Sequence, residues 1–494
     1  MNSLDEINKV LEHNRNYFLF LEKCIVRTSS LFIKYILAKR AIKLAVWSST
    51  GQYCSPVIEN VYLEIAKKIR SPIGDKFEKN STLHIMTECY GVGGHSKVVE
   101  RWISLCENTE KHSIIFTNQK VKSIPRVFLE LVKQKKDGEV ISLSNYNFIL
   151  SKAKILRKLA SGYERIVLHT HMYDVVPLVA FGTEDFTRPI ILYNHADHLF
   201  WLGATIADTV AETREWGKLF SQSYRNIEYS SVLSIPPENL QLVGVNNISV
   251  PIDGIRSDYF TILSVGSGHK FIELNNDNYT NYMKWVLKKY SNVIFILVGP
   301  IKGLFSEWDK LSELYPNRIH IIGPKPNDEL HRLIRSSHLV VDSFPMSGGT
   351  VLGDAVSLGV PVLALRSITG HLDYTYKSES YCNSFEELLY KTERFFSEPI
   401  YRTILSKDII QYFNESENIQ EWKLRLDTIQ KNLPQKHKLK KIDQPKTHEF
   451  SDLDRFILKV HESKRTIFNF FGIISISVYR RFGILRMSIE RTKL

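Results

Sequence analysis

Short apolar runs alternate with longer amphipathic segments over most of the chain, from residue 83 to residue 365. Such alternation is typical of strands and helices that take turns in a parallel α/β sheet. The runs fall into two series. The first predicts strands at 83–88, 112–117, 139–143, 165–169 and 190–193, and the second at 261–265, 293–298, 319–322, 339–342 and 360–365. The sequence therefore predicts two doubly wound units in tandem.

The pattern divides the chain into four parts. Residues 1–80 mix apolar and basic residues at helical spacing, which predicts a helical extension. We expect one Rossmann-like domain over 81–250 and a second over 251–432, joined by the polar stretch SVPIDGIRSDYF at 249–260. Residues 433–494 begin with PQKHKLKKIDQPKTH, which predicts a basic linker before an amphipathic helical tail.

The net charge of +12 lies at the two ends of the chain. Residues 434–494 hold 14 Lys and Arg against 6 Asp and Glu, and residues 1–50 hold 8 against 4, so the centre sums to zero. A nucleic-acid enzyme usually carries its positive charge around the active groove. We therefore expect no nucleic-acid partner.

The same composition bears on the compartment. The five cysteines are scattered and form no CxxC pair, which favours free thiols in a reducing environment. The first ten residues are polar and do not resemble a signal peptide. The longest mostly apolar run, 467–479, has 13 residues, whereas a membrane-spanning helix needs about 20. We expect a cytoplasmic protein without a transmembrane segment.

The stretch FPMSGGTVLGDAVSLGVPVLAL at 344–365 sets a glycine turn directly before a helix. A helix N-terminus has free N–H groups and a partial positive charge, so it binds phosphate. Gly348 and Gly349 let a phosphate approach the backbone, and Thr350 adds a hydroxyl donor. Asp354 follows about one helical turn later, where it can accept hydrogen bonds from ribose. The pattern predicts a nucleoside diphosphate site, and a tight turn without a ligand is the alternative.

A second glycine loop, SVGSGHKF at 264–271, opens the same predicted domain. Gly266 and Gly268 follow the first strand, and Lys270 comes just beyond them. Two such sheets in tandem place their ligands in a crevice between them, beyond the carboxyl ends of the strands. A lysine at a strand end that faces this crevice could neutralise a diphosphate leaving group. A surface lysine after a flexible loop is the alternative.

The segment YPNRIHIIGPKPNDELHRLIRSSHLVVDSFPMSGGTVLGDAVSLGVPVLAL at 315–365 resembles the nucleotide-binding half of GT-B glycosyltransferases. It is most similar to the O-linked N-acetylglucosamine transferase family and its bacterial relatives that glucosylate proteins in the cytoplasm. The resemblance implies that Asp354 holds the ribose and that Lys270 contacts the diphosphate. It also implies phosphate contacts from Gly349, Thr350 and Val351, and base contacts from the backbone near Pro324 and Lys325. By the same resemblance, 251–432 would be the nucleotide-sugar-binding domain and 81–250 the acceptor-side domain.

One departure from the GT-B pattern concerns the stereochemistry. Retaining GT-B enzymes commonly carry two Glu residues at the places that Met346 and Asp354 occupy here. Their absence favours an inverting transfer, which needs one general base near the acceptor hydroxyl with a pKa near the working pH.

Histidines follow three predicted strands of the first domain. ECYGVGGHSKVVERW at 88–102 places His95 after a glycine loop, and the resembled family has a His in the corresponding loop. VLHTHMYDVVPL and ILYNHADHLFWLG add further His residues at strand ends. Since His titrates near neutral pH, the candidates for the base are His95, His171, His195 and Asp197. Core histidines and a zinc site are the alternatives, and a dinucleotide loop is disfavoured because GxGxxG spacing is missing.

The sequence thus predicts a glycosyltransferase that moves a hexosyl or N-acetylhexosaminyl group from a nucleotide sugar, and a UDP-sugar is the expected donor. We expect the reaction to need neither a metal nor a cofactor. We expect a glycan, lipid-linked or protein acceptor in bacterial surface-polysaccharide or glycolipid synthesis. The basic tail suggests peripheral binding to an anionic membrane at its inner face. A cytoplasmic protein glycosyltransferase and a non-catalytic GT-B-like scaffold are the alternatives.

Overall fold

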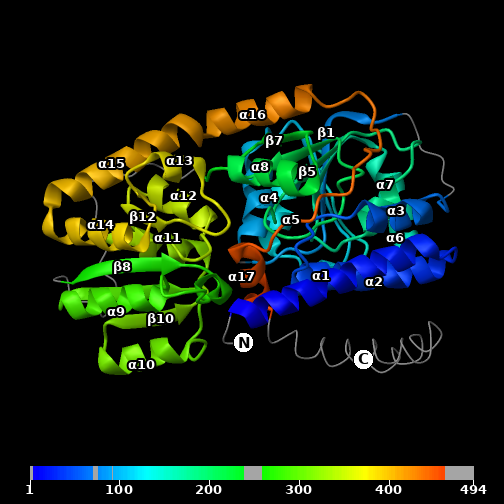
Figure 1. The fold of residues 1–494 in the computed structure, drawn as a ribbon. Helices are drawn as coiled ribbons and strands as arrows, with labels where there is room; N and C mark the ends of the chain where they lie inside the picture. The colour runs from blue at the N-terminus through cyan, green and yellow to red at the C-terminus, as the bar shows by residue number, and fades with distance from the viewer. Residues whose placement is uncertain (1–3, 70–75, 92, 239–258, 462–494) are drawn as a thin grey trace.

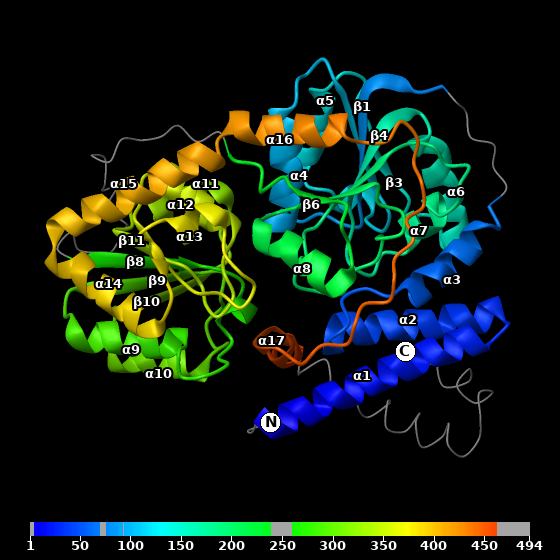
Figure 2. The ribbon, with the colours of Figure 1, turned by 45° about the horizontal axis from the view of Figure 1, so that its top comes forward.

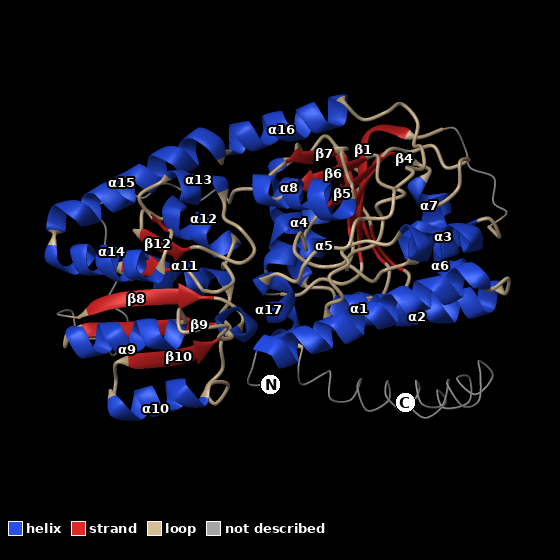
Figure 3. Ribbon diagram, in the orientation of Figure 1, coloured by secondary structure: helices blue, strands red, loops and turns tan. Residues whose placement is uncertain are grey.

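The computed structural model of the chain describes residues 4–69, 76–91, 93–238 and 259–461. Figure 1 shows two α/β domains side by side, with long helices packed along the N-terminal one. Each domain is built on one parallel sheet between helices (Figure 3). The predicted fold class of two Rossmann-like domains with helical extensions is confirmed.

The N-terminal domain contains a seven-stranded parallel sheet in the order β3-β2-β1-β4-β5-β6-β7. Its strands are β1 (Glu78–Met86), β2 (Lys111–Phe116), β3 (Val140–Ser142), β4 (Tyr163–His169), β5 (Ile190–Tyr193), β6 (Thr209–Glu212) and β7 (Ser230–Val232). The helices are α4 (Gly94–Leu105), α5 (Arg126–Lys133), α6 (Ile149–Ala160), α7 (Val176–Phe181) and α8 (Glu215–Arg225). The last six residues of β1 are buried, as a central strand with helices on both faces requires.

The C-terminal domain contains a six-stranded parallel sheet in the order β10-β9-β8-β11-β12-β13. Its strands are β8 (Phe260–Val265), β9 (Val293–Val298), β10 (Ile319–Gly323), β11 (Leu339–Val341), β12 (Val362–Leu365) and β13 (Tyr381–Cys382). The helices are α9 (Tyr279–Lys289), α10 (Ser306–Leu314), α11 (Asn327–Arg335), α12 (Thr350–Ser357), α13 (Asp373–Lys377), α14 (Phe385–Ser397) and α15 (Pro399–Ser416). In both sheets the strand order reverses beside the first strand, and ligands of doubly wound folds bind at that point.

Three helices form the predicted N-terminal extension: α1 (Leu4–Arg27), α2 (Leu31–Ser48) and α3 (Pro56–Ala66). Their apolar faces join the same core as strands β1, β4 and β5. The extension is therefore part of the N-terminal domain rather than a separate unit.

The chain returns to the N-terminal domain through α16 (Ile419–Lys431), as Figure 2 shows. Trp422 and Leu426 of this helix pack with Trp102 of α4 and Val167 of β4. The expected C-terminal domain ran to residue 432. By its packing, however, α16 belongs to the N-terminal domain, because its apolar stripe is covered there.

Residues 434–451 form an extended strap along the N-terminal domain, seen in orange in Figure 1. His437 Nδ1 lies 2.8 Å from Asp208 Oδ2 with both side chains buried, and Ile442 joins the N-terminal core. This segment is therefore a packed strap, not the free linker that its charge and prolines suggested. It ends in α17 (Asp452–Val460), whose Leu458 packs with Ile7 and Leu11 of α1.

Three strands escaped the sequence pattern: β6, β7 and β13. They have four, three and two residues and lie toward one edge of each sheet. Runs this short carry no periodicity to read. The expected interdomain linker lies mostly outside the described residues, and so do the predicted apolar stripe of the tail and the basic residues beside it.

Candidate active site

A cavity of about 590 Å³ lies between the two domains. Its walls come from the carboxyl ends of strands in both sheets, where the topology places a ligand. All of the predicted site residues except His171 line this cavity: His95, His195, Asp197, Gly266, Gly268, Lys270, Pro324, Lys325, Gly348, Gly349, Thr350, Val351 and Asp354. The crevice expected from the tandem architecture is therefore present.

The turn before α12 is held by an acid at the end of β11. Asp342 is buried, and its Oδ1 accepts hydrogen bonds from the N–H groups of Ser343 at 2.8 Å and Gly348 at 2.7 Å. A Cβ at position 348 would lie 2.8 Å from that oxygen, so this tight turn needs glycine there. Gly349 has φ +67°, and no side chain caps the helix that follows. The N-terminus of α12 thus faces the cavity uncapped, ready for an anion.

Lys270 ties the first glycine loop of this domain to the same turn. Its Nζ donates to the carbonyl of Ser347 at 2.7 Å. Burial lowers the pKa of Lys270 to about 8, although the charge of Asp342 acts in the opposite direction. The side chain is mostly cationic at neutral pH and stands beside the anion-binding turn. This is the position that stabilisation of a departing diphosphate requires.

The loop after β10 forms another part of the wall. Pro324 and Lys325 line the cavity, and Lys325 Nζ lies 2.7 Å from Glu329 on α11. The charge of Lys325 is thus paired, so the loop offers its backbone more than its ammonium group. That agrees with the expected role in contacting the base.

Asp354, the predicted ribose ligand, lies at a contact between the domains. Its Oδ1 accepts a hydrogen bond from Arg101 Nη2 at 2.6 Å, and its Oδ2 lies 3.3 Å from Lys97 Nζ. Arg101 and Lys97 are both residues of α4. Burial would raise the pKa of Asp354, but Arg101 above all, together with His331 at 3.6 Å and Lys97, holds it well below its usual range. A ribose would therefore have to share this carboxylate with Lys97 and Arg101 of α4, or break its contacts with them.

Glu238 strengthens the same contact. It pairs with Arg101 and lies 3.6 Å from His331 Nε2. Two carboxylates, Glu238 after β7 and Asp354 on α12, thus converge on α4. Since both acids are paired with cations, the cluster is an electrostatic clasp between α4, α11 and α12.

Three of the predicted histidines gather at the N-terminal wall. The rings of His95 and His195 are 4.2 Å apart, and those of His95 and His171 are 5.4 Å apart. His95 Nε2 donates to the carbonyl of His169 at 2.8 Å, which leaves Nδ1 as the bare nitrogen. Among the described residues no donor reaches that buried Nδ1. Burial lowers the pKa of His95 to about 4, so the ring is neutral and able to accept a proton.

His171 stands one layer back from the main cavity. It lines a small adjoining pocket together with His95 and His195, and its Nδ1 lies 3.0 Å from the hydroxyl of Tyr173. The sequence placed it correctly at a strand end, but the structure sets it beside the candidate bases rather than at the main cavity.

Asp197 is an ion-pair partner rather than a free base. Arg214 donates two hydrogen bonds to Asp197, from Nε to Oδ2 at 2.8 Å and from Nη2 to Oδ1 at 3.1 Å. Burial would raise the pKa of Asp197, but the charge of Arg214 outweighs it and holds the pKa well below its usual range. Both oxygens are engaged and the carboxylate is a weak proton acceptor. The geometry thus argues against Asp197 as the general base and leaves the histidines.

Sequence reasoning missed the cations of the cleft: Lys97, Arg101 and Arg214. Arg214 donates across the cleft to the carbonyl of Gly370 at 3.3 Å. Lys97 and Arg101 are four residues apart on α4, a spacing that predicts only a shared helical face. Their partner Asp354 lies more than 250 residues away along the chain, and nothing in the sequence pattern links them.

Two solved structures share this architecture. A mutant of the O-GlcNAc transferase of Thermobaculum terrenum is 13% identical to this chain, and the match covers 91% of this chain and 83% of that one with a TM-score of 0.51. Anabaena HepE in complex with UDP and glucose is 15% identical, and its match covers 72% of this chain and 100% of that one with a TM-score of 0.50. The chain has the GT-B fold.

No protein-family model and no curated protein matches the sequence. At the identities above, the likeness shows the GT-B fold and leaves the chemistry to be argued from the residues of the cleft. In this GT-B fold, the anion-binding turn and Lys270 belong to the C-terminal domain and the histidines to the N-terminal domain.

Proposed function

We propose that the protein is a glycosyltransferase that transfers a hexosyl or N-acetylhexosaminyl group from a UDP-sugar to an acceptor hydroxyl with inversion. One observation carries this proposal. The turn before α12, which suits an anion, and His95, whose Nδ1 is unprotonated, line the same cavity from opposite domains. Thr350 approaches the opposite domain closely, because a Cβ on Gly94 would lie 3.6 Å from its side chain. A donor on the turn would therefore have its reacting end near His95 and His195.

Each wall has a separate task in this reaction. Lys270 and the N–H groups at the start of α12 stabilise the charge that grows on the diphosphate as the glycosidic bond breaks. Asp354 binds the ribose, and the loop with Pro324 and Lys325 contacts the base. His95 or His195 removes the acceptor proton. The residues supply the charge stabilisation that a metal gives elsewhere, so we propose a reaction without metal or cofactor.

Binding of the donor tests the proposal first. A ligand that binds only the folded state raises the melting temperature, so 1 mM UDP or a UDP-sugar is expected to raise it by several degrees. Lys270→Met should lose most of that shift. If no nucleotide or nucleotide sugar shifts melting at millimolar concentration, the donor site is refuted. Binding without any turnover or hydrolysis of the sugar would favour the non-catalytic scaffold.

The acceptor is proposed on charge alone. The basic ends of the chain suit a glycan or lipid-linked acceptor of surface-polysaccharide synthesis at an anionic membrane surface. Within the described part of the chain, no helix combines the length and apolar character needed to cross a bilayer. We therefore propose a peripheral attachment at most. A polypeptide acceptor is the alternative, which an assay with both classes of acceptor decides.

A further inference from the structure

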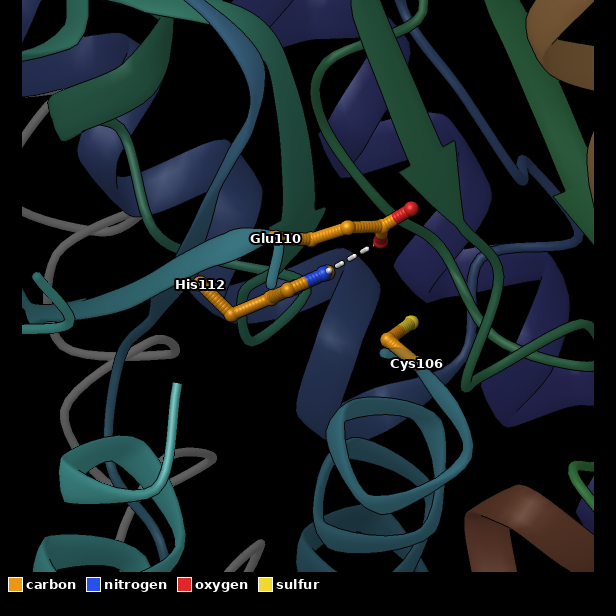
Figure 4. Close-up of side chains that lie close together, drawn as sticks. All are labelled: Cys106, Glu110 and His112. Atoms are coloured by element: carbon orange, nitrogen blue, oxygen red, sulfur yellow. Dashed lines mark hydrogen bonds and ion pairs between the residues drawn. The ribbon is translucent and has the colours of Figure 1, made fainter. Parts of the chain in front are cut away.

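Three buried histidines and the half-buried His195 form an unbroken line of side-chain hydrogen bonds through the N-terminal sheet. His195 Nε2 lies 3.0 Å from His169 Nδ1, His169 Nε2 lies 3.1 Å from His84 Nδ1, and His84 Nε2 lies 3.0 Å from His112 Nδ1. The line ends where His112 Nε2 meets Glu110 Oε2 at 3.2 Å, as Figure 4 shows. Its other end, His195, lines the cavity between the domains.

The register of the sheet produces this line. His112 on β2 lies opposite Thr82 of β1, and His84 is two residues further along β1. His169 of β4 lies opposite Met86, again two residues beyond His84. Each step to the next strand thus advances by two residues, which keeps every ring on one face and within diagonal reach. The rings climb from the amino end of the sheet, at Glu110, to the carboxyl end, at the cleft.

Packing alone gives no reason for these residues. His84 and His169 are fully buried, and both rings touch Trp102, an apolar side chain of α4. Burial holds the pKa of His84, His169 and His195 well below the usual range, so the rings are neutral. Apolar side chains of similar volume would suit such a layer at least as well. A fully connected polar line in that place calls for a functional reason.

Glu110 determines which nitrogen of each ring carries the proton. The hydrogen bond with His112 is the largest of the effects that lower the pKa of Glu110, so the group is a carboxylate and only accepts. His112 must then donate from Nε2 and accept at Nδ1. The same requirement passes to His84, His169 and His195 in turn, so all four rings carry the proton on Nε2. The bare nitrogen at the cleft end is Nδ1 of His195.

We propose that Glu110, His112, His84 and His169 are positioning residues that fix the tautomer of His195 and receive the charge when His195 acts as the general base. This inference rests on the proposed function, because it assigns the base among the candidates of that site. The partner of the relay is the hydroxyl of the acceptor, whose proton must leave as the new glycosidic bond forms.

The proton balance closes without ring rotation. The acceptor hydroxyl gives its proton to His195 Nδ1 as its oxygen bonds to the anomeric carbon and the diphosphate leaves with the electron pair of the broken bond. His195 passes its Nε2 proton to His169 Nδ1, and His169 and His84 each pass on their own. His112 then holds both protons as a cation paired with the Glu110 carboxylate. When the products leave, each proton moves back by one nitrogen and His195 Nδ1 releases one to water.

The groups around the outer end favour this use over a metal site. Cys106 lies beside Glu110 and His112 (Figure 4), and three such side chains could form part of a metal site. Three cations, Lys135, Arg165 and Lys423, act electrostatically on this cluster. They disfavour a divalent cation and stabilise the carboxylate form of Glu110. Burial raises the pKa of the Cys106 thiol to about 12, so it stays protonated at neutral pH when no metal is bound.

The tautomers are measured directly by ¹⁵N NMR of the full chain labelled in histidine, with no substrate present. Resonances are assigned by single His→Gln variants at the four positions. We expect an Nε2–H tautomer for all four rings at pH 7. In Glu110→Gln, whose amide can donate or accept, His112 should lose its fixed tautomer. A wild-type Nδ1–H tautomer at any of the four positions overturns the relay, and so does one equivalent of zinc that copurifies and binds at His112.

Kinetics supply the second readout. Glu110→Gln is expected to lower kcat for sugar transfer about tenfold, with the KM for the donor unchanged, since the donor lies on the other domain. Glu110→Asp, which keeps the charge, should lie between the two. Glu130→Gln is the matched control, because Glu130 is an exposed acid paired with Arg126 on α5, away from the relay. Equal kcat in Glu110→Gln and the control overturns the proposal. Failure of the proposed transfer would instead show as missing donor binding or turnover, and it would leave the tautomers unchanged.

Discussion

At the scale of single residues, Lys270 gives the sharpest test of the donor site. Its pKa is lowered to about 8 by burial, and only the cation stabilises a departing diphosphate. Since a lysine loses its charge as pH rises through its pKa, kcat/KM should fall above about pH 8. Lys270→Met should lower kcat by about 100-fold, as the loss of one charge-stabilising donor does in other enzymes. It should also remove the alkaline fall, and a pH profile from 6.5 to 9.5 measures both effects.

The matched control for Lys270 is Lys325→Met. Lys325 lines the same cavity, but its ammonium is paired with Glu329. A small effect on kcat and an unchanged alkaline limb are expected. If the alkaline limb persists in Lys270→Met, another group is responsible for it, and an unchanged kcat would show that Lys270 has no role in turnover.

The residues that the sequence identified are those whose function depends on local chain geometry. Lys270 follows a strand end, and the Gly348–Asp354 turn opens a helix, so both are visible in a short window. Asp197 shows the limit of that reasoning. Its residue type and strand-end position suggested a base, but its protonation depends on Arg214, which the fold brings to it. Nothing in the sequence pattern marked His84 or His112, because the alignment of the four relay histidines depends on strand register, which the sequence does not display.

At the scale of elements, α4 and α12 are held together by the clasp around Asp354. The Arg101 side chain is 7% exposed and that of Asp354 is 2% exposed, so loss of one partner leaves a buried charge. Breaking such a pair costs about 3–5 kcal/mol. Arg101→Met is therefore expected to lower the free energy of unfolding by about 3 kcal/mol, measured by urea denaturation.

Two controls make the clasp prediction specific. Arg126→Met removes an arginine that is 90% exposed in its pair with Glu130, and a change within about 0.5 kcal/mol is expected. The double variant Arg101→Met with Asp354→Leu should lose less than the sum of the single variants, because the two side chains interact directly. Additive losses would show that the two residues do not stabilise each other.

Strands that form continuous apolar runs were predicted from the sequence, and the mutual packing of the elements was not. Strands β5 and β9 were placed to the residue, since VIFILV and IILY are apolar runs bounded by polar turns. The helix at 419–431 was counted with the domain that precedes it. Its Trp422 gives no sign in the sequence of which core it enters, and only the three-dimensional structure shows that it crosses to the N-terminal domain.

At the scale of the whole molecule, the strap and α17 pack against the N-terminal domain and its helical extension. Asp454 of α17 accepts hydrogen bonds from Ser49 at 3.0 Å and Tyr53 at 2.8 Å, both just after α2. Lys459 reaches the carbonyl of Glu273 in the other domain at 2.9 Å. Residues 433–461, which read as an appendage by composition, thus connect the helical extension with both domains.

Two truncated chains distinguish this structural role from the membrane role proposed for the basic tail. A chain that ends after His461 keeps the strap and α17, so it should melt near the full-length temperature and bind UDP equally well. A chain that ends after Asn432 loses the buried side chains of Ile442, Leu453, Phe456, Ile457 and Leu458. Each contributes about 1.5–3 kcal/mol, a sum comparable with the stability of a whole domain. We expect this shorter chain to unfold or aggregate.

Sedimentation with anionic liposomes at low salt then tests residues 462–494 alone: the full chain should bind and the chain ending after His461 should not. Equal sedimentation of the two would assign any membrane binding to the folded domains and refute the role of the tail.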